Sequence, residues 1–332
     1  MKEKILIIGA CGQIGVELTT ALRKIYGNEN VVASDIRDEH PLLVGTGPYT
    51  QLDATDAVGT KTLVEREGIT QIYLLAALLS ATGEANPKLC WDLNMSSLRQ
   101  VLDLAVEKKL KVFWPSSIAA YGPTTPSENT PQITVMEPST MYGITKYAGE
   151  LLAQYYNKRY GVDIRSLRYP GLISWKAEPG GGTTDYAVDI YIQALKQGKY
   201  TCFLSENTPL PMMYMDDAIR ATIELMQAPV ESLKTHMAYN LSAMSFTPKQ
   251  VADEIKKHVP NFEISYAPDH RQAIADSWPG SIDDSVARAE WGWRHEYDLG
   301  KMTEAMLLNL KNKYATPYSE TSSKEERDCN SK

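Results

Sequence analysis

The sequence predicts an α/β fold, with a doubly wound parallel sheet and a smaller C-terminal part. Three observations carry this prediction. Short apolar runs alternate with amphipathic segments of helix length, a glycine-rich turn directly follows the first run, and the alternation ends after Pro170. Such alternation is typical of strand–helix–strand units joined in a parallel sheet. The runs expected as strands are residues 5–8, 31–34, 72–77, 112–116 and 164–169.

The composition is that of a soluble globular chain, and it excludes several classes of protein. The 332 residues have a formal charge of −7 and are 43% apolar. A net negative chain lacks the concentrated basic surface that nucleic acids require, and no apolar run approaches the length of a membrane span. The five histidines and four cysteines are scattered, without the spacing of metal ligands. We therefore expect no nucleic-acid partner, no membrane contact and no metal.

The glycine-rich turn has the form of a dinucleotide-binding loop. Residues 9–15 read GACGQIG and lie between the first expected strand and a helical pattern over residues 16–26. Glycines at these spacings permit a tight turn and a close approach of the backbone to a pyrophosphate at the start of a helix. The alternative is a turn that serves packing only. With the strand and helix around it, the motif predicts a Rossmann-type sheet.

Acidic residues follow the second expected strand and the apolar stretch after it. Asp35 ends the second strand, where a carboxylate can bind the hydroxyls of an adenosine ribose. Its charge would repel a 2′-phosphate, which favours NAD over NADP, while the nearby Arg37 leaves NADP open. Asp53, directly after Leu52, could meet the edge of the adenine. The following strand ends with residues that let the cofactor pass closely, at Leu75, Ala76 and Ala77.

A tyrosine and a lysine on one predicted helix form the chemical end of the site. Tyr142 and Lys146 are one helical turn apart, so both side chains lie on one face. A free tyrosine has a pKa of about 10, and a nearby ammonium favours its phenolate. Ser117 lies at the carboxyl end of a strand, where open α/β sheets bind ligands, and can orient a substrate oxygen. Without Ser117, an ordinary surface tyrosine and lysine would be the better interpretation.

In these motifs the sequence resembles the extended short-chain dehydrogenase/reductases, over about residues 4–314. The resemblance implies that Tyr142 is the general acid/base and that Lys146 binds the cofactor ribose and lowers the pKa of the phenol. It also implies that Ser117, in preference to Ser116, polarises the substrate, and that the cofactor is NAD. The residues expected to contact the cofactor are Gly9, Gly12, Gln13, Ile14, Gly15, Asp35, Arg37, Leu52, Asp53, Leu75, Ala76, Ala77, Asn94, Tyr142, Lys146 and Tyr169.

Two segments point to one branch of that family. Residues 179–187 and 210–218 resemble the short-chain L-threonine 3-dehydrogenases, as do residues 276–279. This resemblance implies oxidation of L-threonine at its 3-hydroxyl to 2-amino-3-ketobutyrate. The glycine run 180–182, before a helix, suits a small carboxylate and could hinge a lid. The residues expected around the substrate are Ser80, Ser117, Tyr142, Gly180, Thr183, Thr184 and Trp278.

Two alternatives stay open. Most extended members act on nucleotide sugars, so the first is an epimerase, dehydratase or reductase of such sugars. Those enzymes usually carry an asparagine shortly after the strand equivalent to residues 167–169, and residues 170–173 contain none. The second alternative is a non-catalytic dinucleotide-binding sensor. It predicts the loss of Ser117, Tyr142 or Lys146, and all three are present.

The chain divides at Pro170. We expect residues 1–170, with later returning segments, to form the NAD-binding domain and residues 171–314 to form mainly a substrate-binding or lid region. Residues 315–332, rich in Ser, Thr, Glu and Lys, are expected to be a disordered tail. Helical patterns recur at residues 216–227, 247–258 and 299–313, the second with Thr247 as N-cap and Pro248 at its first position.

Assembly and location follow from the resemblance. It implies a homodimer, formed through the helix of Tyr142 and the helix near residues 94–108. Because residues 1–4 lead directly into the first strand, we expect an intracellular protein. By the resemblance, this means the mitochondrial matrix in a eukaryote and otherwise the cytoplasm.

Overall fold

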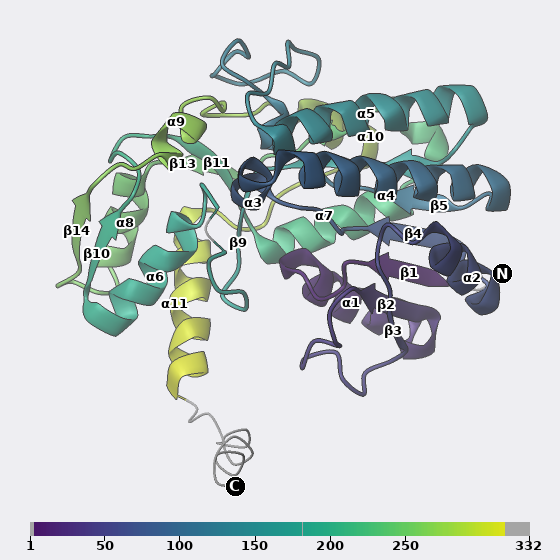
Figure 1. Cartoon of the computed structure of the whole chain (residues 1–332). Helices are drawn as coiled ribbons and strands as arrows, with labels where there is room; N and C mark the ends of the chain where they lie inside the picture. The colour runs from purple at the N-terminus through teal and green to yellow at the C-terminus, as the bar shows by residue number, and fades with distance from the viewer. Residues whose placement is uncertain (1–2, 181, 316–332) are drawn as a thin grey trace, which may run out of the picture.

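Six parallel strands form the central sheet, in the order β3-β2-β1-β4-β5-β7 (Figure 1). The computed structural model describes residues 3–180 and 182–315. In the register, Ile5 pairs with Val31 on one side and Gln71 on the other. This arrangement confirms the predicted fold class. The strands are β1 (Ile5–Ile8), β2 (Val31–Asp35), β3 (Tyr49–Gln51), β4 (Gln71–Leu74), β5 (Lys111–Phe113) and β7 (Ile164–Arg165).

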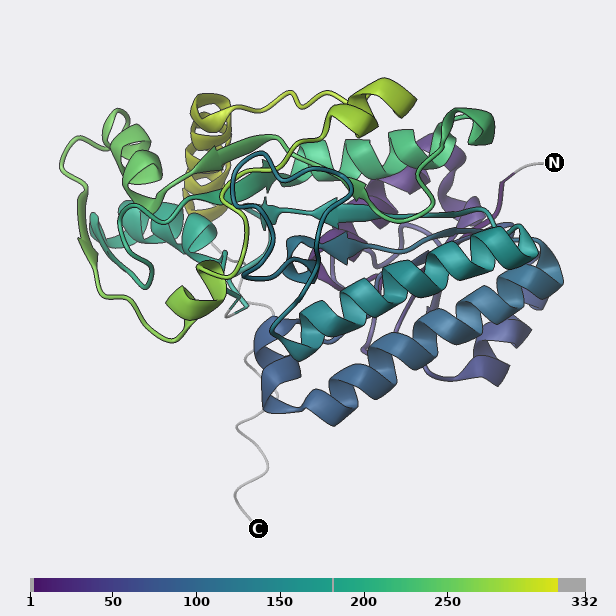
Figure 2. The same cartoon turned by 90° about the horizontal axis from the view of Figure 1, so that it is seen from above.

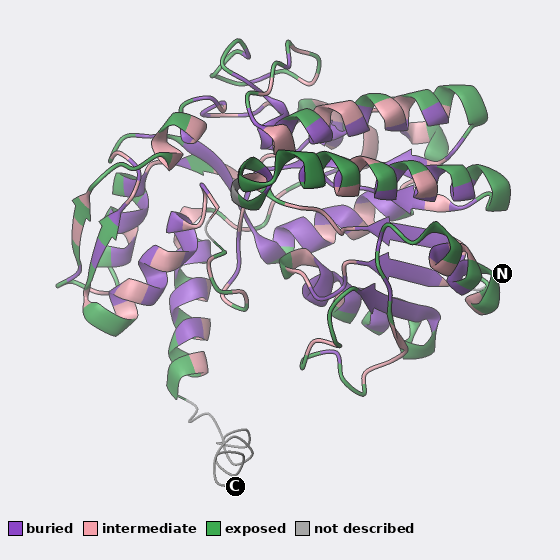
Figure 3. Ribbon diagram, in the orientation of Figure 1, coloured by how far each residue is buried: buried purple, intermediate pink, exposed green. Residues whose placement is uncertain are grey.

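Helices cover both faces of this sheet because both faces of β1 are apolar. Ile5 and Ile7 pack among residues of α1 and α7, whereas Leu6 and Ile8 pack among residues of α2, α4 and α5. Figure 2 shows α4 and α5 side by side on one face, and Figure 3 shows the strands buried between the layers. These helices are α1 (Gln13–Tyr26), α2 (Ala57–Glu67), α4 (Pro87–Lys108), α5 (Met141–Tyr160) and α7 (Met215–Gln227).

Three of the expected strands are shorter than predicted or divided. The strand expected at 72–77 ends at Leu74, after which the N–H groups of Leu75 and Ala76 both donate to the carbonyl of Ile8. The strand expected at 112–116 is interrupted by Pro115, which has no N–H to continue a ladder. It resumes as β6 (Ser116–Ser117).

The last expected strand contributes to two sheets. Residues 164–169 divide at Ser166, so that β7 extends the central sheet and β8 (Leu167–Tyr169) pairs with β6 and with β12 (Tyr239–Asn240). Ser117 pairs with Tyr169 in this register. The separate sheet β12-β8-β6 thereby brings Ser117 and Tyr169 together.

The chain after Pro170 builds a second hydrophobic core. Tyr186, Met212, Phe246 and Met306 are buried in it. Its sheets have the orders β13-β11-β9 and β10-β14. The elements are β9 (Gly171–Ile173), α6 (Tyr186–Gln197), β10 (Lys199–Cys202), β11 (Leu210–Tyr214), β13 (Met244–Phe246), α8 (Pro248–Lys256), β14 (Glu263–Tyr266), α9 (Arg271–Ala275) and α11 (Leu299–Ala315).

The start of α8 confirms a predicted cap. The Thr247 hydroxyl accepts the Gln250 N–H at 3.2 Å, the Gln250 side chain accepts the Thr247 N–H at 2.8 Å, and Pro248 is the first helical residue. Of the expected tail, only Ala315 belongs to the described residues, as the end of α11; the rest lies outside them. None of the described helices is long and apolar enough to cross a membrane. The short helices are α3 (Ser80–Ala85), α10 (Ser285–Trp291), η1 (Asn28–Asn30), η2 (Ile118–Ala120) and η3 (Val230–Ser232).

Candidate active site

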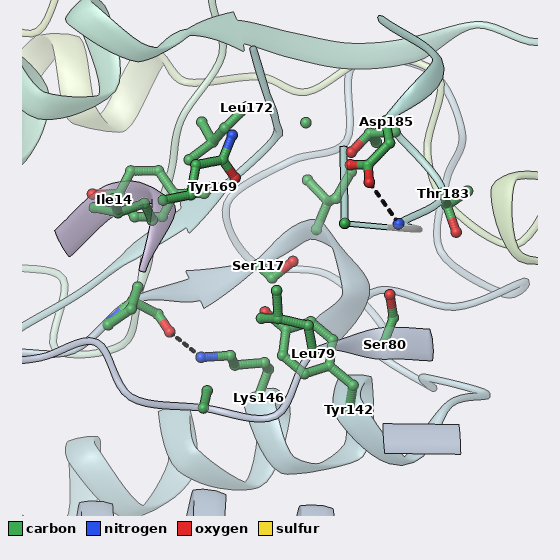
Figure 4. Close-up of a pocket in the computed structure, with 18 of the residues that line it drawn as sticks. Ile14, Leu79, Ser80, Ser117, Tyr142, Lys146, Tyr169, Leu172, Thr183 and Asp185 are labelled. Atoms are coloured by element: carbon green, nitrogen blue, oxygen red, sulfur yellow. Dashed lines mark hydrogen bonds between the residues drawn. The ribbon is translucent and has the colours of Figure 1, made fainter. Parts of the chain in front are cut away.

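A cavity of about 460 Å³ lies at the carboxyl ends of β1, β4, β6 and β8, the edge where parallel sheets bind ligands. Its walls come from both sides of Pro170. The first part of the chain contributes Gln13, the segment after β4, and the expected catalytic residues Ser117, Tyr142 and Lys146. The part after Pro170 contributes β9, the loop before α6, and Trp278. Figure 4 shows Tyr142, Ser117 and Lys146 on one side and Thr183 and Asp185 on the other.

Tyr142 and Lys146 stand on the first turns of α5. Thr140 caps this helix, with its hydroxyl accepting the Gly143 N–H at 3.1 Å. The Lys146 Nζ donates to the carbonyl of Pro115 at 2.6 Å. The same ammonium lies 4.5 Å from the ring centroid of Trp114 and 5.4 Å from that of Tyr142. The cation is therefore held against the ring of Tyr142 on one side and the strand end on the other.

Burial dominates the electrostatics of this pair. Burial raises the pKa of Tyr142 to about 12, and a hydrogen bond with the Ser117 hydroxyl acts in the opposite direction. Burial also lowers the pKa of Lys146 to about 7, opposed by Cys90 and Glu150. Burial disfavours the charged form of each group. In the chain by itself, burial therefore outweighs the effect of Lys146 on the pKa of the phenol.

The two candidate serines have different surroundings. The Ser117 side chain is half-buried, lines the cavity, and accepts the Ala119 N–H at 3.2 Å. The Ser116 side chain is buried, and its hydroxyl donates to the Glu150 carboxylate at 2.5 Å. Ser117 is therefore the serine whose hydroxyl is available to a substrate.

The glycine turn fits a dinucleotide. Gly9 has φ +94°, and a Cβ there would lie 2.5 Å from the Ala76 nitrogen; a Cβ on Gly15 would lie 2.3 Å from the Gly9 carbonyl oxygen. Only glycine can occupy either position without moving the backbone. Gly12 is the N-cap of α1, and because glycine has no side chain to cap the helix, the first N–H groups are left for an anion. These features suit the pyrophosphate of NAD.

Asp35 ends β2 beside this turn. Its carboxylate accepts the Cys11 N–H at 3.0 Å and the Arg37 Nε–H at 3.0 Å. Burial raises the pKa of Asp35, but the hydrogen bonds from Arg37 and Cys11 outweigh it, and the pKa lies below its ordinary value. The carboxylate is thus ionised and could also accept ribose hydroxyls. The Leu52 N–H donates to the Asp35 carbonyl, while Asp53 is exposed and accepts from Thr55.

The structure brings about half of the predicted site residues into the cavity. Those that line it are Gln13, Ile14, Leu75, Ala77, Ser80, Ser117, Tyr142, Lys146, Tyr169, Gly180, Thr183, Thr184 and Trp278. Those that do not line it are Gly9, Gly12, Gly15, Asp35, Arg37, Leu52, Asp53, Ala76 and Asn94. Most of the second group surround the glycine turn and β2.

Asn94, expected at the cofactor, is buried beside the segment that follows β4. Its side-chain amide accepts the Leu78 N–H at 2.9 Å and donates to the Leu78 carbonyl and to the Thr145 hydroxyl, each at 3.1 Å. It therefore ties the segment after β4 to α4 and α5, and does not line the cavity. Asn94 thereby supports the wall that contains Leu75, Ala77 and Ser80.

Sequence reasoning missed several residues of the cavity. Asp185 lines it and accepts the Gly182 N–H at 2.8 Å, a contact drawn in Figure 4. An aspartate directly before a helical pattern is a signal that could have identified it. The other missed residues are Leu78, Leu79, Thr82, Pro115, Ser116, Ile118, Pro170, Gly171, Leu172, Glu178 and Gly182. The middle glycine of the run 180–182 lies outside the described residues.

The Rossmann-type sheet, the glycine turn and the group formed by Ser117, Tyr142 and Lys146 (the Ser–Tyr–Lys group) together define an NAD-dependent oxidoreductase. Comparison with known proteins agrees. Residues 5–242 match the NAD dependent epimerase/dehydratase family. The chain belongs to this family, the extended short-chain dehydrogenase/reductases that the motifs predicted, and its cofactor is NAD.

Individual relatives give more detail. An uncharacterized epimerase/dehydratase of Staphylococcus haemolyticus is 53% identical over 94% of this chain and 98% of the relative. A partial consensus L-threonine 3-dehydrogenase is 60% identical, with a TM-score of 0.91 over 93% of this chain and 99% of that structure. The holo form of a GalE-like L-threonine dehydrogenase from Cupriavidus necator is 58% identical, with a TM-score of 0.91 over 92% and 99%. A monomeric L-threonine 3-dehydrogenase from a metagenome is 50% identical, with a TM-score of 0.89 over 93% and 99%.

Proposed function

We propose that this chain oxidises L-threonine at its 3-hydroxyl to 2-amino-3-ketobutyrate, with NAD as the acceptor. The observation that carries the proposal is that one cavity joins the Ser–Tyr–Lys group to a small polar wall formed by Ser80, Thr183, Thr184 and Asp185. The similar structures of L-threonine dehydrogenases at 58% and 60% identity support the same substrate.

Tyr142 takes the proton in this proposal. The Ser117 hydroxyl donates a hydrogen bond to the substrate oxygen, and the Tyr142 phenolate removes the proton of the 3-hydroxyl. Lys146 places a positive charge against the phenol ring and stabilises the phenolate. NAD, when bound, supplies an electrophilic nicotinamide ring that accepts the hydride from the 3-carbon. Because burial raises the pKa of Tyr142 to about 12, the chain's own residues need an added positive charge to favour the phenolate.

The polar side chains that line the cavity suit the two ends of an amino acid. The carboxylate of Asp185 can balance an ammonium group. The hydroxyls of Ser80, Thr183 and Thr184, with the N-terminus of the 12-residue helix α6, can bind a carboxylate. Trp278 and Gly180 border the same space and close it around a small substrate.

The cofactor residues of the proposal extend from this cavity along the sheet edge. The turn with Gly9, Gly12 and Gly15 holds the pyrophosphate, Asp35 holds the adenosine ribose, and Arg37, Leu52 and Asp53 border the adenine. We further propose that residues 1–170, with the returning segments that contain α7 and β12, form the NAD-binding domain, and that residues 171–314 form mainly the substrate-binding part. The two separate hydrophobic cores support this division.

A second candidate function is the conversion of a nucleotide sugar. The observation that favours it is the name of the Staphylococcus haemolyticus relative, an uncharacterized epimerase/dehydratase. The experiment that separates the two candidates is the initial rate of NADH formation with L-threonine, L-serine, L-allo-threonine and a panel of nucleotide sugars. Selective reduction of NAD with L-threonine supports the proposal. Conversion of a nucleotide sugar, with no reaction of threonine, would overturn it.

The assembly is a further proposal. Figure 3 shows exposed residues along α4 and α5. The large apolar ones among them are Leu89, Trp91, Ile144, Leu151 and Tyr155. A dimer through these two helices would bury them. The similar monomeric structure argues against it, and the bacterial relative gives no support to a mitochondrial location. Light scattering of the purified chain measures the mass directly, and a monomer at micromolar concentration would contradict the dimer.

A further inference from the structure

Gly171 stands at a crowded point in the floor of the cavity. It is the first residue of β9 and pairs with Met212 of β11. A Cβ on Gly171 would lie 2.8 Å from the Thr184 Cγ2, 2.9 Å from the Thr184 Cβ and 2.3 Å from the Met212 sulfur. The space that a side chain would need is therefore already filled by Thr184 and Met212.

The contact with Gly171 determines where Thr184 lies. Met212 is completely buried, so the strand beside Gly171 offers no other room. The Thr184 carbonyl accepts the Ala187 N–H at 3.1 Å in the first turn of α6. Tyr186 and Ala187 are fully buried in the second core. Thr184 is thus confined between the backbone of Gly171 and helix α6, whose first residues are fixed in the second core.

This contact joins the two halves of the site. Gly171 directly follows Tyr169 and Pro170 and shares the cavity with Ser117 and Tyr142. Thr183 and Asp185 lie on the opposite wall (Figure 4), and Thr184, between them in the chain, also lines the cavity. A shift of Thr184 away from β9 would move this wall relative to the phenol of Tyr142.

We propose that Gly171 is a specificity-determining position, where the missing side chain lets Thr184 pack directly on β9 and so sets the width of the cavity for a small hydroxy amino acid. The inference rests on the proposed function, because the substrate it names is the amino acid. Gly171 is a positioning residue: it acts through Thr184 and its neighbours.

The test is a double-mutant cycle, in which one variant adds a methyl group on the Gly171 side of the contact and the other removes a methyl group on the Thr184 side. Gly171→Ala adds a methyl where Thr184 now lies, and Thr184→Ser removes the methyl nearest to Gly171 while it keeps the hydroxyl. We expect Gly171→Ala to raise the KM for L-threonine by about tenfold or more, and Thr184→Ser to raise it less. In the double variant the new methyl replaces the lost one, so its KM should lie below that of Gly171→Ala. The clash with the Met212 sulfur is the same in both Gly171 variants, so the comparison of their KM values reports on Thr184.

Two measurements distinguish an effect of Gly171 on the position of Thr184 from a general disruption of the folded site. The Kd for NAD, measured by titration without turnover, should stay within about twofold in all variants, because the glycine turn lies apart from this contact. Gly300→Ala is the matched control, since its Cβ would lie 3.5 Å from Asp298 Oδ1 and 3.7 Å from Glu254 Oε1, which are ordinary contacts. Should Gly171→Ala fail to bind NAD, the Thr184→Ser variant tests the contact alone: a raised KM supports it and an unchanged KM overturns it.

The outcomes also separate this inference from the proposed function. Wild-type protein that does not oxidise threonine overturns the function and, with it, the substrate named here. Wild-type protein that oxidises threonine, with an unchanged KM in Gly171→Ala or no recovery in the double variant, overturns the role of Gly171 alone.

Discussion

The carboxylate of Glu150 and the guanidinium of Arg168 form an ion pair closed to solvent, with 2.7 Å between Glu150 Oε2 and Arg168 Nη2. The Glu150 carboxylate also accepts the Ser116 hydroxyl at 2.5 Å. Glu150 lies one turn beyond Lys146 on α5, and Arg168 pairs with Ser116 in the sheet β12-β8-β6. This pair therefore ties the helix of Tyr142 and Lys146 to the strand that ends at Ser117.

Replacing the acidic member of this pair should destabilise the fold. Glu150→Gln leaves a buried guanidinium without its counter-charge, which costs about 3–5 kcal/mol of unfolding free energy. Urea unfolding measures this loss. The double variant Glu150→Gln/Arg168→Met removes both charges and should recover much of it. Glu107→Gln breaks exposed ion pairs with Lys61 and Lys108 and should cause no measurable loss. Equal losses for Glu150→Gln and the double variant would contradict the importance of the pairing.

Removal of one hydroxyl tests the proposed general base. Tyr142→Phe should lower kcat by about 10²–10⁴, because acid–base catalysis is typically worth that factor. The Kd for NAD should change little, since the ring that faces Lys146 remains. Tyr160→Phe, at the exposed end of the same helix, is the control and should keep its turnover. Turnover by Tyr142→Phe close to that of the wild type would exclude the mechanism.

The burial of Lys146 predicts a pH-dependent stability. Burial lowers the pKa of Lys146 from 10.5 to about 7, so between these values the unfolded chain binds a proton that the folded chain does not. The contribution of Lys146 to stability is therefore present above 10.5 and is lost as the pH falls through about 7. Lys146→Met removes this titration.

The measurement compares the unfolding free energies of wild type and variant without NAD. Lys146→Met should be stabilised relative to wild type most strongly at about pH 6, and the difference should shrink by about pH 9. The exposed Lys61→Met variant should differ from wild type equally at both pH values. A difference for Lys146→Met that does not depend on pH would show that its ammonium is not strongly desolvated.

Asp35 should govern the choice between NAD and NADP. Asp35→Ala removes a carboxylate that can accept hydrogen bonds from ribose hydroxyls. It also frees the Arg37 guanidinium, which in the wild-type chain pairs with Asp35 at 3.0 Å. We expect the ratio of kcat/KM for NAD to that for NADP to fall by about ten- to a hundredfold, the range of a lost hydrogen bond to a charged group. Asp253→Ala is the control, because Asp253 is exposed on α8 and pairs with the exposed Lys249 and Lys256. An equal fall in Asp253→Ala and Asp35→Ala would contradict the role of Asp35.

Much of the site could be predicted because its chemistry lies in short stretches of chain. The strand–turn–helix around residues 9–15 and the single turn between Tyr142 and Lys146 each depend on local backbone geometry. The Thr247–Pro248 start of α8 is predicted by the same kind of local rule. The choice of NAD followed from such stretches as well.

Other features depended on residues far apart in the sequence. Asp185 and Gly171 belong to the cavity only because the second core places α6 against β9. The hydrogen bonds of the Asn94 amide with Leu78 and Thr145 likewise join separate elements. No periodicity along the chain reports such contacts, since they form only when separate elements pack together.

By itself, the sequence determined the parallel α/β sheet, its glycine turn and the Ser–Tyr–Lys group, because strand and helix periods and turn residues are properties of neighbouring positions. Only the tertiary structure decided three matters. Residues 164–169 contribute to two sheets. The Ser116 hydroxyl is bonded to Glu150, while Ser117 lines the cavity. Burial disfavours the charged forms of both Tyr142 and Lys146. Pairing partners and desolvation are set by the atoms that surround a residue in the folded chain, and those atoms come mostly from distant parts of the sequence.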